Sequence, residues 1–127
     1  MHRFLVLILC CSSFQIFAES KGEHCQLLGS LCALQTSFES ADKELNDVYK
    51  SIISRIKSGD LSDRMLVDSA ELKQSLLSSQ RSWLKFKKSN CDAFYVLHSG
   101  GSQRNEARME CEIEMTKERI NYLRSWY

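Results

Sequence analysis

No proline interrupts this chain, and its apolar residues recur with the period of an α-helix, not with the alternation of a strand. Steps of three or four residues place one apolar stripe on one side of a helix. The first such stripe contains Leu34, Phe38, Ala41, Leu45, Val48, Ile52 and Ile56. It predicts a helix over residues 33–57, followed by Gly59, because glycine readily adopts the left-handed conformation that closes a helix.

Two further segments follow the same period. A helix is predicted over residues 63–97, with Asp60 or Ser62 as its N-cap. Its apolar arc contains Leu72, Leu76, Leu77, Trp83, Leu84, Phe86, Cys91, Phe94 and Leu97, which we expect in the core. A third helix is predicted over residues 104–125, with a stripe of Met109, Ile113, Thr116, Ile120, Leu123 and Tyr127.

Long amphipathic helices joined by short glycine-containing turns favour an all-α fold, an antiparallel three-helix up-down-up bundle. This path brings the start of the first helix, the end of the second and the start of the third to the same end of the molecule. We expect disulfides to staple that end, because the cysteines outside the leader fall there.

The first eighteen residues have the pattern of a secretory signal peptide. His2 and Arg3 precede an apolar run, and Ala18 offers a cleavage site before the chain turns polar. Residues 19–127 would then form the folded domain, periplasmic or secreted, with no stable membrane insertion. Lipidation at Cys10 or Cys11 is the less favoured alternative, because the small residue expected just before such a cysteine is missing.

Four cysteines would remain after cleavage: Cys25, Cys32, Cys91 and Cys111. An even number in an oxidising compartment favours two disulfides. We expect Cys91 to pair with Cys111 and Cys25 with Cys32, and a bridge from Cys32 to the second helix is the alternative. No metal site or cofactor is expected, because no CxxC pair occurs and the histidines are not at ligand spacing.

The charge of the chain argues against nucleic acid as a partner. Cleavage after Ala18 removes one of the 17 basic residues and none of the 16 acidic ones, which leaves the domain close to neutral. The basic run around residue 85 belongs mostly to one side of the second helix, where Arg81, Lys85 and Lys88 form a solvated face.

Polar residues also occur on the apolar arcs, where burial of a charge is costly unless the charge is paired. They are Asp42, Gln80, Lys87, Asn90, Glu112 and Arg119. We interpret them as an interhelical polar cluster, with ion pairs from Asp42 or Glu112 to Arg119 or Lys87. A polar pocket or contact surface between helices is the alternative.

Catalysis has little support in the sequence. None of the common motifs for nucleophilic, metal-dependent or phosphate-binding chemistry is present, and a cysteine nucleophile would need a free thiol where a disulfide is expected. We therefore predict that the chain is not an enzyme and that His98, beside a glycine pair, is an exposed turn residue.

The order of several motifs resembles the lysozyme inhibitor LprI family. These are Cys32, ADKELNDVYK (41–50), QRSWLKFKKSNC (80–91), Gly100 and Gly101, Cys111, and then Thr116, Arg119 and Leu123. The resemblance covers nearly all of residues 19–127. It implies a small, helical, secreted or periplasmic bacterial protein of a family in which at least one member inhibits lysozyme, and it implies no catalytic residues. One departure is Lys87, which stands where arginine is frequent, so that a bidentate carboxylate contact there would be weaker.

The leading hypothesis is a non-enzymatic binding protein that occludes a lysozyme cleft and so protects peptidoglycan. Its expected contact residues are Arg81, Lys85, Lys88, His98 and Arg104. The alternatives are a cell-envelope interaction module that binds another protein without inhibiting lysozyme, and a carrier of a small ligand in the polar cluster. The sequence leaves the oligomeric state open.

Overall fold

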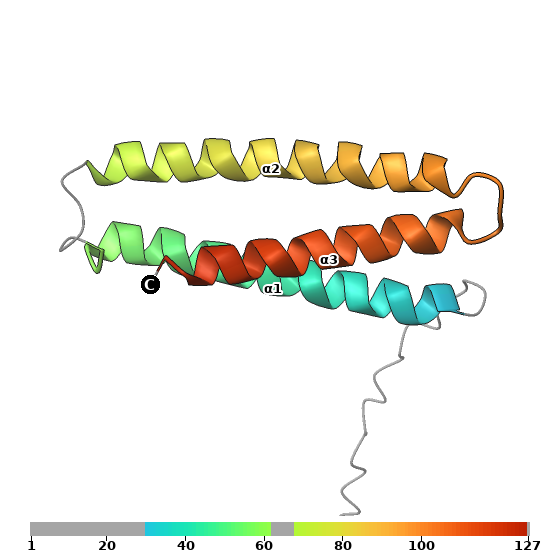
Figure 1. Cartoon of the computed structure of the whole chain (residues 1–127). Coiled ribbons are helices and arrows are strands. Elements are labelled where there is room, and N and C mark those ends of the chain that lie inside the picture. Colours follow the sequence, from blue (N-terminus) through green and yellow to red (C-terminus); the bar gives the residue numbers. More distant parts are fainter. Residues whose placement is uncertain (1–29, 62–67, 127) are drawn as a thin grey trace, which may run out of the picture.

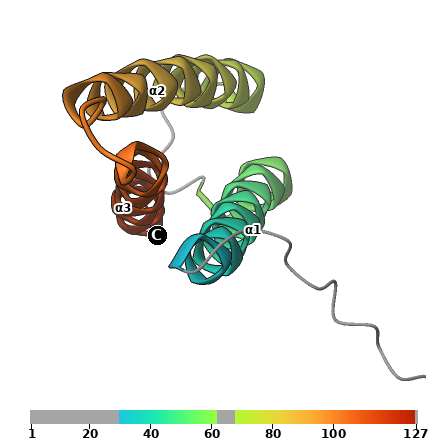
Figure 2. The same cartoon turned by 90° about the vertical axis from the view of Figure 1, so that its right-hand side faces the viewer.

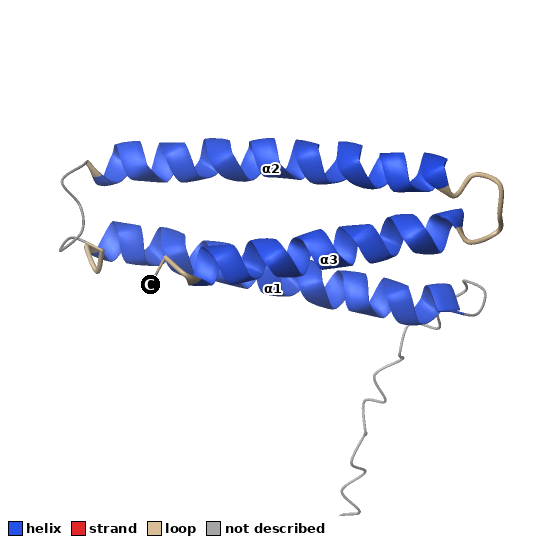
Figure 3. Ribbon diagram, viewed as in Figure 1, coloured by secondary structure: helices blue, strands red, loops and turns tan. Residues whose placement is uncertain are grey.

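The computed structural model describes residues 30–61 and 68–126, which form three helices (Figure 1). They are α1 (Ser30–Ser58), α2 (Ser69–Leu97) and α3 (Arg104–Arg124). Successive helices run in opposite directions, and the described ranges contain no strand (Figure 3). The predicted all-α, antiparallel up-down-up bundle is therefore confirmed. None of these helices is long and apolar enough to span a bilayer.

The ends of the helices follow their local sequences. Gly59 has a φ of 80°, the left-handed conformation predicted for it, and the next amide, of Asp60, donates back to the carbonyl of Arg55 at 3.1 Å. The N-cap of α2 is Asp68, whose carboxylate accepts from the amide of Ala70 at 3.3 Å. The prediction of Asp60 or Ser62 as this cap was wrong, because several residues able to cap a helix lie between the two stripes and the apolar period does not rank them.

The main core forms where α1, α2 and α3 meet near the connection from α1 to α2. Leu45, Ile52 and Ile56 of α1 meet Leu76 of α2 and Leu123 of α3 there, with every one of these side chains at most 2% exposed. Most of the predicted stripe of the first helix is thus confirmed as core. Helix α3 packs extensively on both other helices, whereas α1 and α2 contact each other much less (Figure 2).

The outer part of α2 differs from the prediction. Phe86 is 59% exposed and Leu97 is 76% exposed, and Leu84 and Phe94 are also exposed. Their assignment to the core was wrong. The apolar arc of α2 is wider than the surface that α3 covers, and α1 packs against α2 much less than α3 does.

A disulfide joins α2 to α3 at the end of the bundle that carries the turn between them. Cys91 and Cys111 are bonded, with their Cα atoms 5.6 Å apart and a sequence separation of 20 residues. This confirms the predicted pair. Cys32 is disulfide-bonded as well, and its predicted partner, Cys25, lies outside the described residues. The Ser30 hydroxyl donates to Glu106, so that the start of α1 lies beside the start of α3.

Candidate functional site

Lys87 is a buried cation between α1, α2 and α3. It is 7% exposed, and its ammonium group donates to the hydroxyl of Thr116 at 3.1 Å. The same nitrogen lies 5.6 Å from the ring centroid of Phe38 and 5.2 Å from that of Trp83. Aromatic faces attract cations, and the attraction is stronger when the pair is desolvated. The charge of Lys87 is therefore held by two rings and one hydroxyl.

Arg119 is a second buried cation, 9% exposed, on the face of α3 toward α2. Its guanidinium donates to the side-chain oxygens of Gln80 and Ser79, both at 3.1 Å. It also lies 5.7 Å from the ring of Trp83 and 5.3 Å from the ring of Tyr122. Burial lowers the pKa of Arg119, because a charged group is less stable away from water.

These contacts form an alternating series of rings and cations, which we call the cation–aromatic stack. Its members in spatial order are Phe38, Lys87, Trp83, Arg119 and Tyr122. The series joins all three helices, because Phe38 belongs to α1, Lys87 and Trp83 to α2, and Arg119 and Tyr122 to α3. Since each contact is specific to one register, we infer that the stack fixes how α2 lies along α3.

The carboxylates expected in this cluster lie elsewhere. Among the described residues no ion pair joins Asp42 or Glu112 to Lys87 or Arg119. Asp42 accepts from Asn46 within α1 at 3.1 Å, and Glu112 pairs with Arg108 within α3 at 3.1 Å. The predicted ion pairs are thus replaced by rings and neutral oxygens around the two buried cations.

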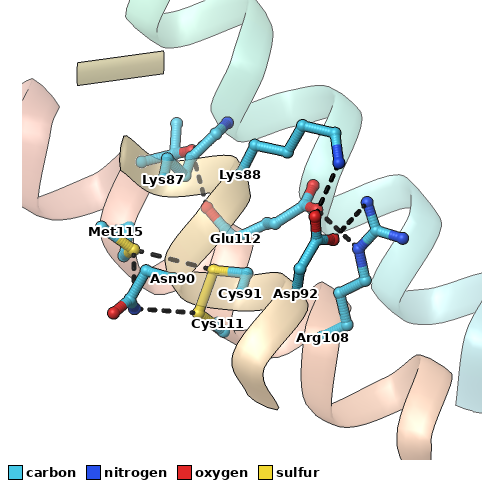
Figure 4. A network of polar contacts seen from close by, with 10 residues as sticks. Lys87, Lys88, Asn90, Cys91, Asp92, Arg108, Cys111, Glu112 and Met115 are labelled. Atoms are coloured by element: carbon cyan, nitrogen blue, oxygen red, sulfur yellow. Dashed lines mark hydrogen bonds and ion pairs between the residues drawn. A yellow bond between two sulfur atoms is a disulfide. The ribbon is translucent and has the colours of Figure 1, made fainter. Parts of the chain in front are cut away.

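A separate charged cluster lies beside the disulfide, on the side nearer α1 (Figure 4). Asp92 pairs with Lys88 at 2.6 Å and with Arg108 at 3.2 Å, and Arg108 continues to Glu112. The hydrogen bond from Lys88, with the positive charges of Lys88 and Arg108, lowers the pKa of Asp92. Sequence reasoning missed Asp92 and Arg108, although both pairs within a helix have the i, i+4 spacing that favours ion pairs.

Asn90 lies on the other side of the disulfide, next to Met115 (Figure 4). Its amide nitrogen is 3.4 Å from the sulfur of Met115 and 3.7 Å from that of Cys111. Asn90 therefore packs against sulfur atoms and does not join the cation–aromatic stack.

A hollow of about 330 Å³ opens between α1 and α3. Leu31, Phe38 and Met109 give it an apolar lining, and its charged groups, Arg108 and Glu112, are already paired with each other. Every buried side-chain nitrogen or oxygen of the described residues has a hydrogen-bond partner. The polar groups therefore support the packing of the helices and give little support to the ligand-carrier hypothesis. Residues 30–61 and 68–126 also contain no group of three or more side chains able to hold a metal ion.

The turn from α2 to α3 presents two of the predicted contact residues, His98 and Arg104. His98 is exposed, with its ring Nδ1 2.9 Å from the carbonyl oxygen of Phe94 and its ring stacked on Phe94. Arg104, also exposed, lies over the ring of Tyr95 at 5.0 Å. His98 and Arg104, at the two ends of this turn, thus each contact an aromatic ring in the last turn of α2.

The remaining predicted contact residues lie along α2. Arg81, Lys85 and Lys88 are all exposed, as expected for a solvated face. Lys88 differs from the other two because it is engaged with Asp92.

Comparison with known proteins gives one family. The chain matches the family model described as "Lysozyme inhibitor LprI" over residues 26–123. No curated protein and no solved structure matches it. The matched range includes all of α1 and α2, the disulfide, the cation–aromatic stack and nearly all of α3. The chain therefore belongs to the lysozyme inhibitor LprI family.

Proposed function

We propose that this protein is an exported, non-enzymatic inhibitor that binds lysozyme and blocks its cleft. The observation that carries the proposal is the family match over residues 26–123. Export is supported by the buried Cys91–Cys111 disulfide, because disulfides form and persist in oxidising compartments outside the cytoplasm. The signal peptide of residues 1–18 and the domain of residues 19–127 are parts of this proposal.

We place the contact with lysozyme at the turn between α2 and α3. Hot spots of protein interfaces are enriched in tyrosine and arginine, and Arg104 lies over Tyr95 at the edge of this turn. The disulfide closes the segment that contains the turn, so little conformational freedom is lost when the turn binds. Lysozyme carries out its reaction with two carboxyl groups in a cleft, and a guanidinium group is well suited to meet a carboxylate.

Arg81 and Lys85 are the second part of the proposed contact surface. Both are exposed, and neither has an ion pair with another described residue. Lys88 is expected to contribute less, because its ammonium group already lies 2.6 Å from Asp92.

A cell-wall lysis assay tests the proposal. Purified protein should slow lysis by lysozyme in a saturable way. Arg104→Ala should weaken inhibition by about tenfold or more, as expected for an interface hot spot, whereas Lys57→Ala, at an exposed position near the end of α1, should match the wild type. Unchanged lysis at a large molar excess of wild-type protein would reject the inhibitor function. Recovery of one envelope partner without lysozyme from an extract would then favour the interaction module.

A further inference from the structure

One side of α2 carries no charge along its second half. Phe86, Asn90, Ala93 and Leu97 follow one another at steps of four, three and four residues, and Ser82 and Ser89 lie beside them at about 100° per residue. We call these six residues the uncharged face. All except Asn90, which is partly buried, are exposed, and Val96 next to them is 67% exposed.

The uncharged face is unusual for this molecule. Arg81, Lys85 and Lys88 of the same helix project in other directions, and exposed charged residues are frequent on α1 and α3. Single exposed apolar residues are normal on a protein surface, whereas an aligned group indicates a place of contact. On the uncharged face, Phe86 and Leu97 are each more than half exposed.

We infer that the uncharged face binds the same face of a second copy of the chain, with the two α2 helices antiparallel. A two-fold axis between residues 89 and 90 would place Phe86 opposite Ala93 of the second copy and Leu97 opposite Ser82 of the second copy. Each large side chain then meets a small one. A parallel pair would set Phe86 against Phe86 and Ala93 against Ala93, which leaves a clash in one layer and a gap in another.

The lack of charge favours a second copy over an unrelated partner. In a symmetric dimer each surface patch meets itself, so a charged face would meet like charges, which is unfavourable. The uncharged face avoids this repulsion. A single two-fold axis also pairs each large residue of the uncharged face with a small one. Binding a partner of different sequence would not require this pattern.

The size of the face sets the expected strength of the dimer. Residues 82–97 of a helix extend about 22 Å, and a strip about 10 Å wide along them covers roughly 220 Å² per copy. A stable complex usually buries about 800 Å² per partner. The dimer is therefore expected to be transient, with a dissociation constant in the micromolar range or weaker.

Sedimentation equilibrium of the full domain tests the inference. The average mass of the wild type should rise toward that of a dimer with concentration. Phe86→Glu should raise the dissociation constant at least tenfold, and Ala93→Arg should do the same from the small side of the contact. Arg81→Glu, at an exposed position on another side of α2, should leave the dissociation constant within about twofold of the wild type, with circular dichroism verifying that each variant is folded.

A charge pair tests the antiparallel register. Ser82→Lys and Leu97→Glu should each weaken self-association, and an equimolar mixture of the two variants should associate more strongly than either alone. In the mixed dimer the new lysine faces the new glutamate, while the other contact between residues 82 and 97 keeps its native side chains. A wild type that stays monomeric at millimolar concentration, an unaffected Phe86→Glu variant or a mixture that regains no association would each overturn the inference. None of these readouts depends on lysozyme, so the dimer is tested independently of the proposed inhibition.

Discussion

Removal of the Cys91–Cys111 disulfide should destabilise the domain by an amount that can be calculated in advance. The bridge closes a segment with a sequence separation of 20 residues. In the chain-entropy model, opening a loop of this size raises the conformational entropy of the unfolded chain, which lowers the free energy of unfolding by about 3 kcal/mol at 25 °C. For a domain of about 100 residues, this corresponds to a fall in melting temperature of roughly 12–24 °C.

The variant for this measurement is Cys91→Ala with Cys111→Ala, unfolded in urea and followed by circular dichroism. The substitutions also leave small voids, because Cys91 is 0% exposed and Cys111 is 7% exposed. The slope of the unfolding free energy against urea concentration distinguishes loss of the bridge from the formation of voids. Loss of the bridge should make this slope steeper, since an unbridged unfolded chain exposes more surface.

Ile113→Val is the matched control, because it removes one buried methylene from α3 two residues after Cys111 and leaves the bridge intact. It should cost about 0.5–1.5 kcal/mol with an unchanged urea dependence. If the double alanine variant lost less than about 1 kcal/mol, restriction of the unfolded chain would not be the way in which this bridge stabilises the protein, and the reasoning above would fail.

Three smaller changes test other parts of the structure. Gly59→Ala should cost about 1 kcal/mol in urea unfolding, because φ at this position is 80°, whereas Gly100→Ala should be nearly neutral, since a Cβ there meets nothing within 4 Å. Arg119→Lys should cost about 1–2 kcal/mol, because a lysine cannot keep both hydrogen bonds of the fork to Gln80 and Ser79. The folded protein lowers the pKa of Asp92, so its ionised carboxylate stabilises the fold above the unfolded pKa of about 3.9, and this stabilisation is lost as the pH falls through the folded pKa. Asp92→Asn should therefore make the melting temperature fall less steeply than in the wild type as the pH drops below about 4. An unchanged slope would count against the contact with Lys88.

The helices and the disulfide between α2 and α3 could be predicted because their signals are local. The stripe of α1 is continuous, and most of its predicted members are buried. Gly59 and the turn at Gly100 and Gly101 fall between helices, as their backbone freedom suggests. An antiparallel path then brings Cys91 close to Cys111 without further information.

The coverage of α2 could not be predicted, because periodicity shows which side of a helix is apolar but not how many neighbours cover it. Phe86 and Leu97 belong to the apolar arc by spacing and remain exposed in the fold. The answer depends on how α1 and α2 lie relative to each other, and that is a property of all three helices together.

The polar cluster could be predicted only in part, and the reason is related. Lys87 and Arg119 stood out because they are charged residues on apolar arcs, and both are buried. Their partners were expected to be carboxylates, the usual solution for a buried charge. The structure instead places the ring of Trp83 between them, and a contact between residues of different helices leaves no mark in the spacing of either one.

The central position of α3 has a consequence for how the protein is made. Helices α1 and α2 have little surface in common, and each depends on α3 for most of its packing. Since α3 is synthesised last of the three, the preceding segments cannot reach a stable tertiary structure while the ribosome is still adding it. The export proposed above would then act on a chain that stays loose until its third helix has been made, and a fragment ending at Gln103 should accordingly lack a cooperative thermal transition.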